Sequence, residues 1–202
     1  MLSERVAELR QEEEESLTGE AFQGETVTGL ELWDLEFTDV SFTKCRFIDC
    51  RFGGSSFYRV RLEGCDFSNC SFTDSRWKDC ILADCKGLGA DFRASRWRGC
   101  SLEGCVLRMA NFTQSMWEGC GWKDCNFGQS MWMECKLNKL KAAGCDLTGV
   151  NFFRTPLKGL DLSSCDIEGI MVSETFGELK GLRVGAHQTV GLARLIGMKV
   201  EN

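Results

Sequence analysis

The residues of this chain with the most chemistry available to them are its thirteen cysteines, and all stand at residue numbers divisible by five. Thiolates can ligate metals, attack electrophiles or form disulfides. The thirteen are Cys45, Cys50, Cys65, Cys70, Cys80, Cys85, Cys100, Cys105, Cys120, Cys125, Cys135, Cys145 and Cys165. Neither a helix nor a strand has a period of five. The spacing therefore indicates a short structural repeat that must be assigned before any local site.

A second column of large apolar residues follows two positions after the first. It includes Phe37, Phe42, Phe47, Phe52 and Phe57, and it continues in the same frame to Val172. The only residues of this column that lack a bulky side chain are Gly87 and Ala142. The other three positions of each unit are mostly polar, charged or glycine. Two inward columns and three outward positions per unit are thus predicted.

A longer period of twenty residues lies within the five-residue period. Ser55, Ser75, Ser95 and Ser115 recur at this spacing, each followed two residues later by an aromatic residue. Four units therefore make one coil, and equivalent residues stack at about 4.8 Å, the spacing of paired strands. Residues 20–174 are predicted to form about eight such coils, which bury together the apolar face that no single unit can bury alone.

The repeat closely resembles that of the pentapeptide-repeat family, whose unit is a small residue, a polar residue, Leu or Phe, and two polar residues or Gly. The segments 65–69 (CDFSN), 90–94 (ADFRA) and 145–149 (CDLTG) match it directly. The resemblance implies an all-β fold, a right-handed four-sided parallel β-helix whose small and bulky columns both point inward.

Within such a filled bore the cysteines are predicted to act as small buried hydrophobes. Stacked coils would bring thiols within disulfide range, but we expect a cytoplasmic setting, because no signal-like or membrane-spanning apolar run is present. We therefore expect no metal, cofactor or membrane contact. The only histidine, His187, lies outside the repeat, and no nucleotide-binding loop is visible. These observations predict a protein that is not an enzyme.

The two ends depart from the repeat. Residues 1–19 are predicted to form an acidic, partly helical cap, and residues 175–202 a C-terminal capping module with a helix. The tail resembles the C-terminal module of the Qnr and MfpA quinolone-resistance proteins, which implies a two-fold dimer as well as a cap. The residues expected at that dimer interface are Val190, Leu192, Leu195, Ile196, Met198 and Val200. Capping alone is the alternative.

Sorting the outward residues by the twenty-residue period separates two faces of opposite character. The acidic face is defined by Glu31, Asp34, Asp74, Asp91, Glu134 and Glu174, with Arg51, Arg93 and Arg154 among them. It also carries outward apolar residues, of which Met131, Met133 and Phe153 are candidates for partner binding. The basic face is defined by Arg59, Arg76, Lys78, Arg96, Arg98, Lys136, Lys139 and Lys158, which outnumber Glu36, Asp39, Asp79 and Glu118.

The resemblance to Qnr and MfpA implies that the rod binds DNA gyrase or topoisomerase IV by mimicking DNA, and that it protects the enzyme from quinolones or inhibits it. On this hypothesis Asp74, Asp91 and Glu134 imitate phosphates, and no direct contact with nucleic acid is expected. The basic face suits such mimicry only if the rod docks on one side. The alternatives are a scaffold for an unrelated protein, bound through Met131, Met133 and Phe153, and an acidic or nucleic-acid partner on the basic face.

Overall fold

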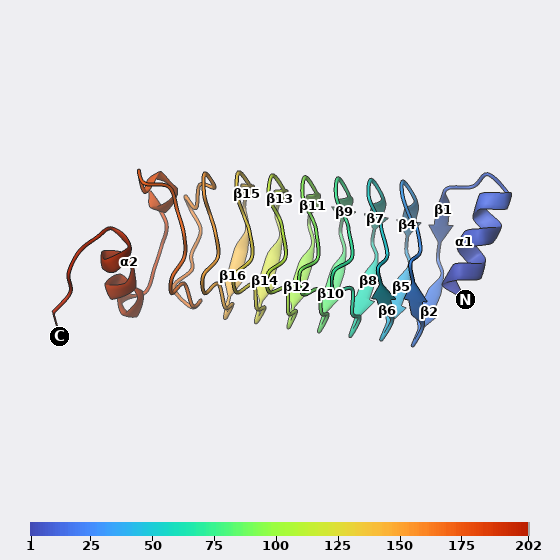
Figure 1. The fold of residues 1–202 in the computed structure, drawn as a ribbon, viewed down its shortest axis with the longest axis horizontal. Helices are drawn as coiled ribbons and strands as arrows, with labels where there is room; N and C mark the ends of the chain where they lie inside the picture. The colour runs from blue at the N-terminus through green and yellow to red at the C-terminus, as the bar shows by residue number, and fades with distance from the viewer. Residues whose placement is uncertain (202) are drawn as a thin grey trace.

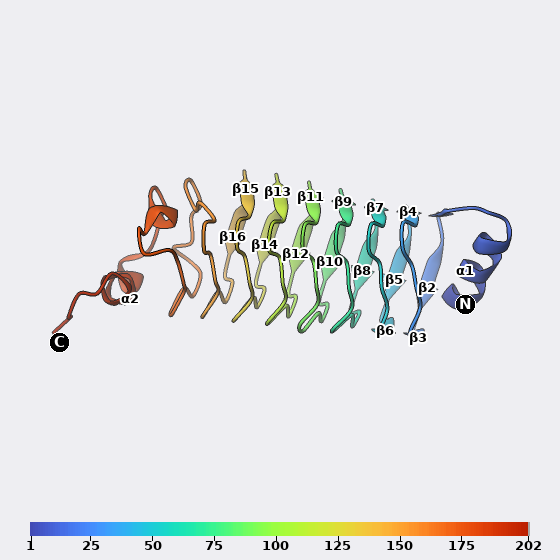
Figure 2. The ribbon, with the colours of Figure 1, turned by 45° about the horizontal axis from the view of Figure 1, so that its top comes forward.

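Residues twenty apart lie side by side in the computed structural model, which describes residues 1–201. The chain winds into a four-sided parallel β-helix, with α1 (Leu2–Gln11) at one end and α2 (Thr189–Leu195) at the other (Figure 1). The ribbon turned by 45° shows the coils in the same order (Figure 2). Leu62, Leu82 and Leu102 are consecutive partners in the ladder. The predicted architecture and the twenty-residue register are therefore confirmed.

Two sides of the rod are long parallel sheets made of three-residue strands. The first runs β1 (Ser16–Thr18), β4 (Glu36–Thr38), β7 (Ser56–Tyr58), β9 (Arg76–Lys78), β11 (Arg96–Arg98), β13 (Met116–Glu118) and β15 (Lys136–Asn138). The second runs β2 (Ala21–Gln23), β5 (Ser41–Thr43), β8 (Arg61–Glu63), β10 (Ile81–Ala83), β12 (Ser101–Glu103), β14 (Gly121–Lys123) and β16 (Lys141–Ala143). Seven strands per sheet make the regular ladder slightly shorter than the eight coils expected.

The other two sides are held mainly by single bridges. One begins with the strand pair β3 (Thr26–Thr28) and β6 (Arg46–Ile48), and the acidic face has bridges alone, such as Asn111 to Met131. On these sides Asp or Asn often opens the unit and accepts a hydrogen bond from the N–H two residues later, as Asp146 does from Thr148 at 2.9 Å. This local bond tightens the turn, so the unit shortens to a bridge where a strand would otherwise extend.

The first coil begins earlier than the predicted boundary at residue 20. Strand β1 pairs in register with β4, so that Leu17 lies beside Phe37, and both side chains are fully buried. Leu17 continues the bulky inner column by one coil, although the sequence around it lacks the small residue that marks later units. Residues 16–19 therefore belong to the rod and not to the cap.

The bore is filled by aromatic side chains stacked from coil to coil. On the first sheet the rings of Trp77, Trp97 and Trp117 are parallel, with centroids 4.6 and 4.5 Å apart. On the acidic side Phe72, Phe92 and Phe112 stack at 4.9 and 5.1 Å. Offset stacking at such distances adds to the hydrophobic stabilisation of each ring. Packing of identical residues thus supplies the continuous core that a solenoid requires.

All thirteen cysteines are buried and free, as their packing role predicts. Their thiols donate weak hydrogen bonds to backbone carbonyls, for example from Cys105 Sγ to Leu82 O at 3.4 Å. Burial raises the pKa of the Cys45 and Cys135 thiols. These two thiols are therefore poor nucleophiles and poor metal ligands.

Nearly every corner is turned by a residue with positive φ, at numbers ending in four or nine, and Ser164 is an exception. Aspartate, asparagine and glycine dominate there because they tolerate the left-handed conformation best. At Gly99, with φ of +63°, a Cβ would lie only 2.5 Å from Asp79 Oδ1 of the preceding coil. Glycine is needed at this corner for both its conformation and its lack of a side chain.

The ends of the bore are covered by buried groups from both termini. At the first end α1 packs Leu2, Val6 and Leu9 against the opening coil. At the other end two short 3-10 helices, η1 (Gly177–Leu179) and η2 (Ala186–Gln188), precede α2. The buried Gln188 amide donates to the carbonyls of Leu162 and Cys165 at 2.9 and 2.6 Å. These contacts satisfy backbone groups that the last coil would otherwise leave unpaired.

The buried carboxylate Glu178 holds the C-terminal segment onto the preceding coil. It accepts hydrogen bonds from Arg154 N at 2.7 Å and from Ser173 Oγ at 2.9 Å. Burial alone would raise the pKa of the Glu178 carboxyl, but these donors hold that pKa below its ordinary value. The sequence analysis assigned no role to Glu178, because nothing in the repeat pattern distinguishes it.

Candidate functional site

The residues predicted for partner binding lie on one side of the rod, because the register of that side matches the twenty-residue period. Met131 bridges to Asn111 on one side and to Asn151 on the other, and Asp91 stands two coils before Met131. Phe153 and Met133 lie two residues after members of this ladder. The structure therefore brings the two predicted groups, acidic and apolar, together on the acidic face.

Three of the six carboxylates that define this face are paired with an arginine. Asp91 Oδ2 lies 2.7 Å from Arg93 Nη2, and this contact raises the pKa of the Arg93 guanidinium. Glu134 lies 3.4 Å from Arg154 Nη1 and also accepts from Gln114. Asp74, at an exposed corner, has no ion pair within residues 1–201. Of the three predicted phosphate mimics, only Asp74 thus presents an uncompensated charge.

The apolar side chains of the acidic face form an exposed group over its C-terminal half. Met131, Phe153 and Met171 are 36%, 38% and 49% exposed, and Met133 is half-buried. The Arg154 guanidinium lies 5.0 Å from the centroid of the Phe153 ring. At the other end of the same face Trp33 is 54% exposed. Sequence reasoning missed Trp33, although its position one residue after the inner column marks it as outward.

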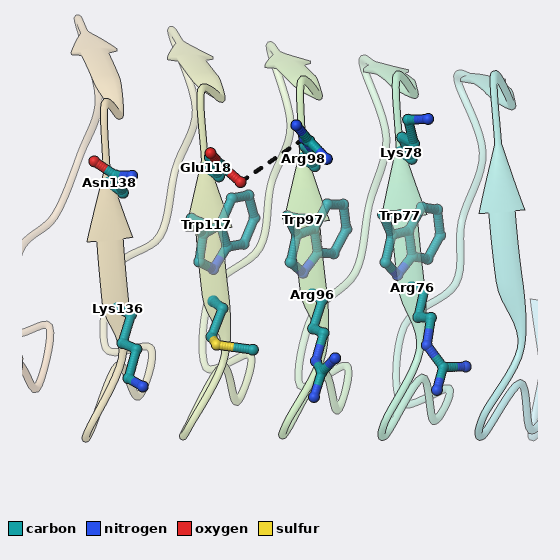
Figure 3. A pocket seen from close by; sticks show the side chains of 11 residues that line it. Arg76, Trp77, Lys78, Arg96, Trp97, Arg98, Trp117, Glu118, Lys136 and Asn138 are labelled. Atoms are coloured by element: carbon teal, nitrogen blue, oxygen red, sulfur yellow. Dashed lines mark ion pairs between the residues drawn. The ribbon is translucent and has the colours of Figure 1, made fainter.

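A groove of about 420 Å³ runs along the basic face, across strands β9, β11, β13 and β15. Figure 3 shows its two walls as rows of outward side chains on either side of the strands. One wall consists of Arg76, Arg96, Met116 and Lys136, and the other of Lys78, Arg98, Glu118 and Asn138. Sequence reasoning found the charge of this face but not the groove, because a groove depends on how the side chains are splayed.

The cations of this groove are largely uncompensated. Within residues 1–201 the only ion pair among them joins Arg98 Nε to Glu118 Oε2 at 3.8 Å. Lys78 Nζ lies 4.7 Å from the centroid of Tyr58, the neighbouring outward aromatic residue. Arg76, Arg96 and Lys136 make no side-chain hydrogen bond or ion pair to described residues. The groove therefore presents a concentrated positive charge.

Buried tryptophans hold the floor of the groove in place. Trp97 Nε1 donates to Ser95 Oγ at 2.8 Å, and Ser95 Oγ in turn donates to the Phe92 carbonyl at 2.6 Å. The same Ser–Trp contact occurs at Ser75, Ser115 and Ser130. Trp122, which follows Cys120, is buried with no partner for its N–H. The recurrence of Ser two residues before Trp therefore has a hydrogen-bonding cause.

The repeat pattern is matched by the model of the pentapeptide repeat region, over residues 35–112 and 70–152. These two overlapping matches together cover more than half of the chain. The chain belongs to the pentapeptide-repeat family. In the comparison with curated proteins, no sequence matches it.

Several solved pentapeptide-repeat structures resemble this protein. A trypsin-treated variant of QnrB1, a plasmid-mediated fluoroquinolone resistance protein, is 21% identical, with a TM-score of 0.50 over 92% of this chain and 97% of QnrB1. HetL, involved in heterocyst differentiation regulation in the cyanobacterium Nostoc, is 10% identical, with a TM-score of 0.45 over 89% of this chain and 91% of HetL. At 21% identity the likeness to QnrB1 shows the shared fold alone.

The C-terminal module of this pentapeptide-repeat protein presents several of the predicted dimer residues to solvent. Val190, Ile196 and Met198 are exposed, whereas Leu192 and Leu195 pack partly against the last coils. Val200 is half-buried, and no strand forms around it. The module therefore caps the rod with one set of apolar side chains and leaves a second set uncovered. The dimer stays a prediction.

Within the described part of the chain, no three or more His, Cys, Asp or Glu side chains are grouped so that they could hold a metal ion. His187 is exposed beside the C-terminal helix, in a shallow hollow that also includes Ser164 and Arg194. Across residues 1–201, no helix combines the length and apolar character needed to cross a bilayer.

Proposed function

We propose that this pentapeptide-repeat protein is a non-enzymatic binding rod that docks through its acidic face on a protein partner, with a type II topoisomerase as the leading candidate. The observation that carries the proposal is the exposed apolar group beside uncompensated carboxylates on an unbroken rod. Flexible methionines and a phenylalanine provide adaptable contact area, and Asp74 and Glu174 provide charge. The fold shared with QnrB1 supports the choice of partner.

The ion pairs modify the mimicry hypothesis. A phosphate mimic needs regularly spaced free charges, since duplex DNA carries one charge per about 1.7 Å. Asp91 and Glu134 are each neutralised by a neighbouring arginine. On this structure, topoisomerase binding would depend on apolar contacts around Met131 and Phe153 together with Asp74. This combination resembles an ordinary protein interface, with an apolar centre and a charged rim.

The test is a gyrase and topoisomerase IV supercoiling or decatenation assay with the purified protein, with and without ciprofloxacin. We expect inhibition or drug protection at low micromolar protein. The double variant Met131→Ser/Phe153→Ser should weaken the effect by about tenfold or more, which corresponds to ~1.4 kcal/mol. Asp74→Asn should weaken it less. Arg61→Ser, on the second sheet, is the matched control and should leave the effect unchanged.

An absence of any effect on either enzyme at high protein excess would rule out a topoisomerase as the partner. The exposed apolar group then favours the second candidate, a scaffold for a different protein. In that case the Met131→Ser/Phe153→Ser variant should fail to retain a partner that the unmodified protein and the Arg61→Ser variant both retain.

A further inference from the structure

The basic groove arranges its outward charges differently from several other parts of the rod. In those parts, side chains twenty residues apart on adjacent coils carry opposite charges and form ion pairs, although Asp146 and Asp166 are like charges that share a bridge. Examples of these ion pairs are Glu31 with Arg51, Asp39 with Arg59, Glu103 with Lys123, and Glu134 with Arg154. In the groove the same register places like charges together, Arg76 beside Arg96 and Lys78 beside Arg98. Like charges directly opposite each other in a ladder are destabilising.

Nothing in the described residues offsets this repulsion apart from Glu118, which lies 3.8 Å from Arg98. Of the nearby carboxylates, Asp39 pairs with Arg59, and Asp79, at the corner after Lys78, makes no ion pair with a described residue. Glu36 lies three coils before Arg96 on the same sheet. A set of stacked cations that the protein itself does not neutralise is suited to an external polyanion.

The shape of the groove selects among polyanions. Its walls are formed by residues two apart on the same strands, so they stand about 7 Å apart, and it crosses four coils, or about 14 Å. One sugar–phosphate backbone fits such a channel, whereas a duplex could only rest on its rims. Three of its cations are arginines, whose planar guanidinium groups can donate two hydrogen bonds to one phosphate.

The interruption of one wall by an apolar residue favours a nucleic acid over an acidic peptide. Met116 stands between Arg96 and Lys136, and its thioether can pack against an aromatic base. Tyr58 lies at the N-terminal end of the same face, where Arg59 and Lys78 now cover its ring. Positive grooves flanked by groups that contact bases are typical of proteins that bind single strands without sequence preference.

We propose that the basic groove binds single-stranded nucleic acid, with Arg76, Lys78, Arg96 and Lys136 contacting successive phosphates and Met116 contacting a base. This site departs from the expectation that the rod makes no direct contact with nucleic acid. It lies on a different side of the rod from the acidic face and does not depend on a topoisomerase partner.

The test is fluorescence anisotropy of labelled (dT)12 and (rU)12 oligonucleotides with the full chain at several salt concentrations. Four contacted phosphates predict a slope of log K against log[salt] of about −3, from −0.7 per phosphate on single strands. The variant Arg76→Ser/Arg96→Ser should reduce the slope to about −1.4 and weaken binding at about 50 mM salt by at least tenfold. Circular dichroism verifies that each variant is folded.

The matched control is Arg46→Ser/Arg108→Ser, which removes the same charge from another side of the rod and should keep the affinity and the slope. Preference for (rU)12 or for (dT)12 identifies the natural strand, and either result supports the site. The proposal is overturned if neither oligonucleotide binds at about 50 mM salt, the lower end of the range in which such contacts weaken steeply. It is also overturned if the control loses as much affinity as the groove variant, or if polyglutamate or duplex DNA binds at least as tightly.

Discussion

The basic face and the acidic face are built on the same repeat but differ in every outward property. Behind the basic face, stacked tryptophans lie under three-residue strands, and the outward cations are mostly unpaired. Behind the acidic face, stacked phenylalanines lie under single bridges, and carboxylates such as Asp91 are matched by arginines. The inner columns of the two faces are interchangeable in their packing role, whereas their surfaces are not.

This difference shows that the outward residues of the rod can vary independently of the residues that fill its core. Inner residues are constrained by the neighbours above and below them, because stacking leaves no other space. Outward residues face solvent and can vary without changing the fold. Candidate binding surfaces can therefore be located by asking where several outward charges of one sign lie together without ion pairs.

The largest effects on the free energy of unfolding are expected in the tryptophan stack behind the basic face and the phenylalanine stack behind the acidic face. Trp97→Ala and Phe92→Ala each remove a fully buried ring from a stack, and each should lower the free energy of unfolding by about 3–5 kcal/mol. Urea denaturation followed by circular dichroism measures both. Met171→Ala, at an outward and half-exposed position of the acidic face, is the control and should change stability by no more than about 0.5 kcal/mol. Loss of stability at only one of the two rings would show that the cores are not equivalent.

Changes to the serine–tryptophan contact should alter the free energy of unfolding by less than the removal of a whole ring. Ser95→Ala removes the acceptor of Trp97 Nε1 and should cost about 1–3 kcal/mol, the range for a buried donor left unpaired. Cys120→Ser would supply Trp122 with the acceptor it lacks and should stabilise the protein by about 0.5–1.5 kcal/mol. Thermal and urea unfolding of both variants test this account. It is contradicted if Cys120→Ser is strongly destabilising, or if Ser95→Ala is neutral.

Changes to surface charges should have the smallest effects on the free energy of unfolding. The change should be destabilising on the acidic face and neutral or stabilising on the basic face. Asp91→Asn removes a largely exposed ion pair and should cost no more than about 1 kcal/mol. Arg96→Ser relieves repulsion with Arg76 and should be neutral or stabilising by about 0.2–1 kcal/mol. Both effects should shrink as salt is added, as calorimetry at two salt concentrations would show. A destabilising Arg96→Ser would mean that this arginine has a structural role.

Much of the fold could be predicted from the residues because the repeat is strict. The Cys column and the Phe, Trp and Leu column locate the core, and the spacing of Ser55, Ser75 and Ser95 gives the register. The sequence also contains the signal for the tighter turns. In units that open with Asp or Asn, such as those of Asp91 and Asp146, that side chain accepts a hydrogen bond from the backbone N–H two residues later. Sequence reasoning assigned the coils but overlooked this difference between the sides of the rod.

The candidate sites were predictable only in part. The twenty-residue period placed Met131, Phe153 and Asp74 on one face, and the cations on another. It could not show that Arg93 and Arg154 neutralise Asp91 and Glu134, because that depends on side-chain rotamers and on the conformation at each corner. It did not place Leu17 in the first coil, because the sequence around Leu17 lacks the small inner residue. Nor could it place Glu178 under the C-terminal segment, where the repeat is absent.

The sequence by itself thus determined the core, the register and the sign of charge on each face, because an inner position repeats its environment in every coil. Only the tertiary structure decided which outward charges meet and which stay free. Ion pairs on the surface join residues either two apart in one coil or one coil apart. Small differences in side-chain direction decide whether Arg98 reaches Glu118 or Arg96 remains unpaired. The uncompensated groove of the basic face follows from those contacts and not from composition.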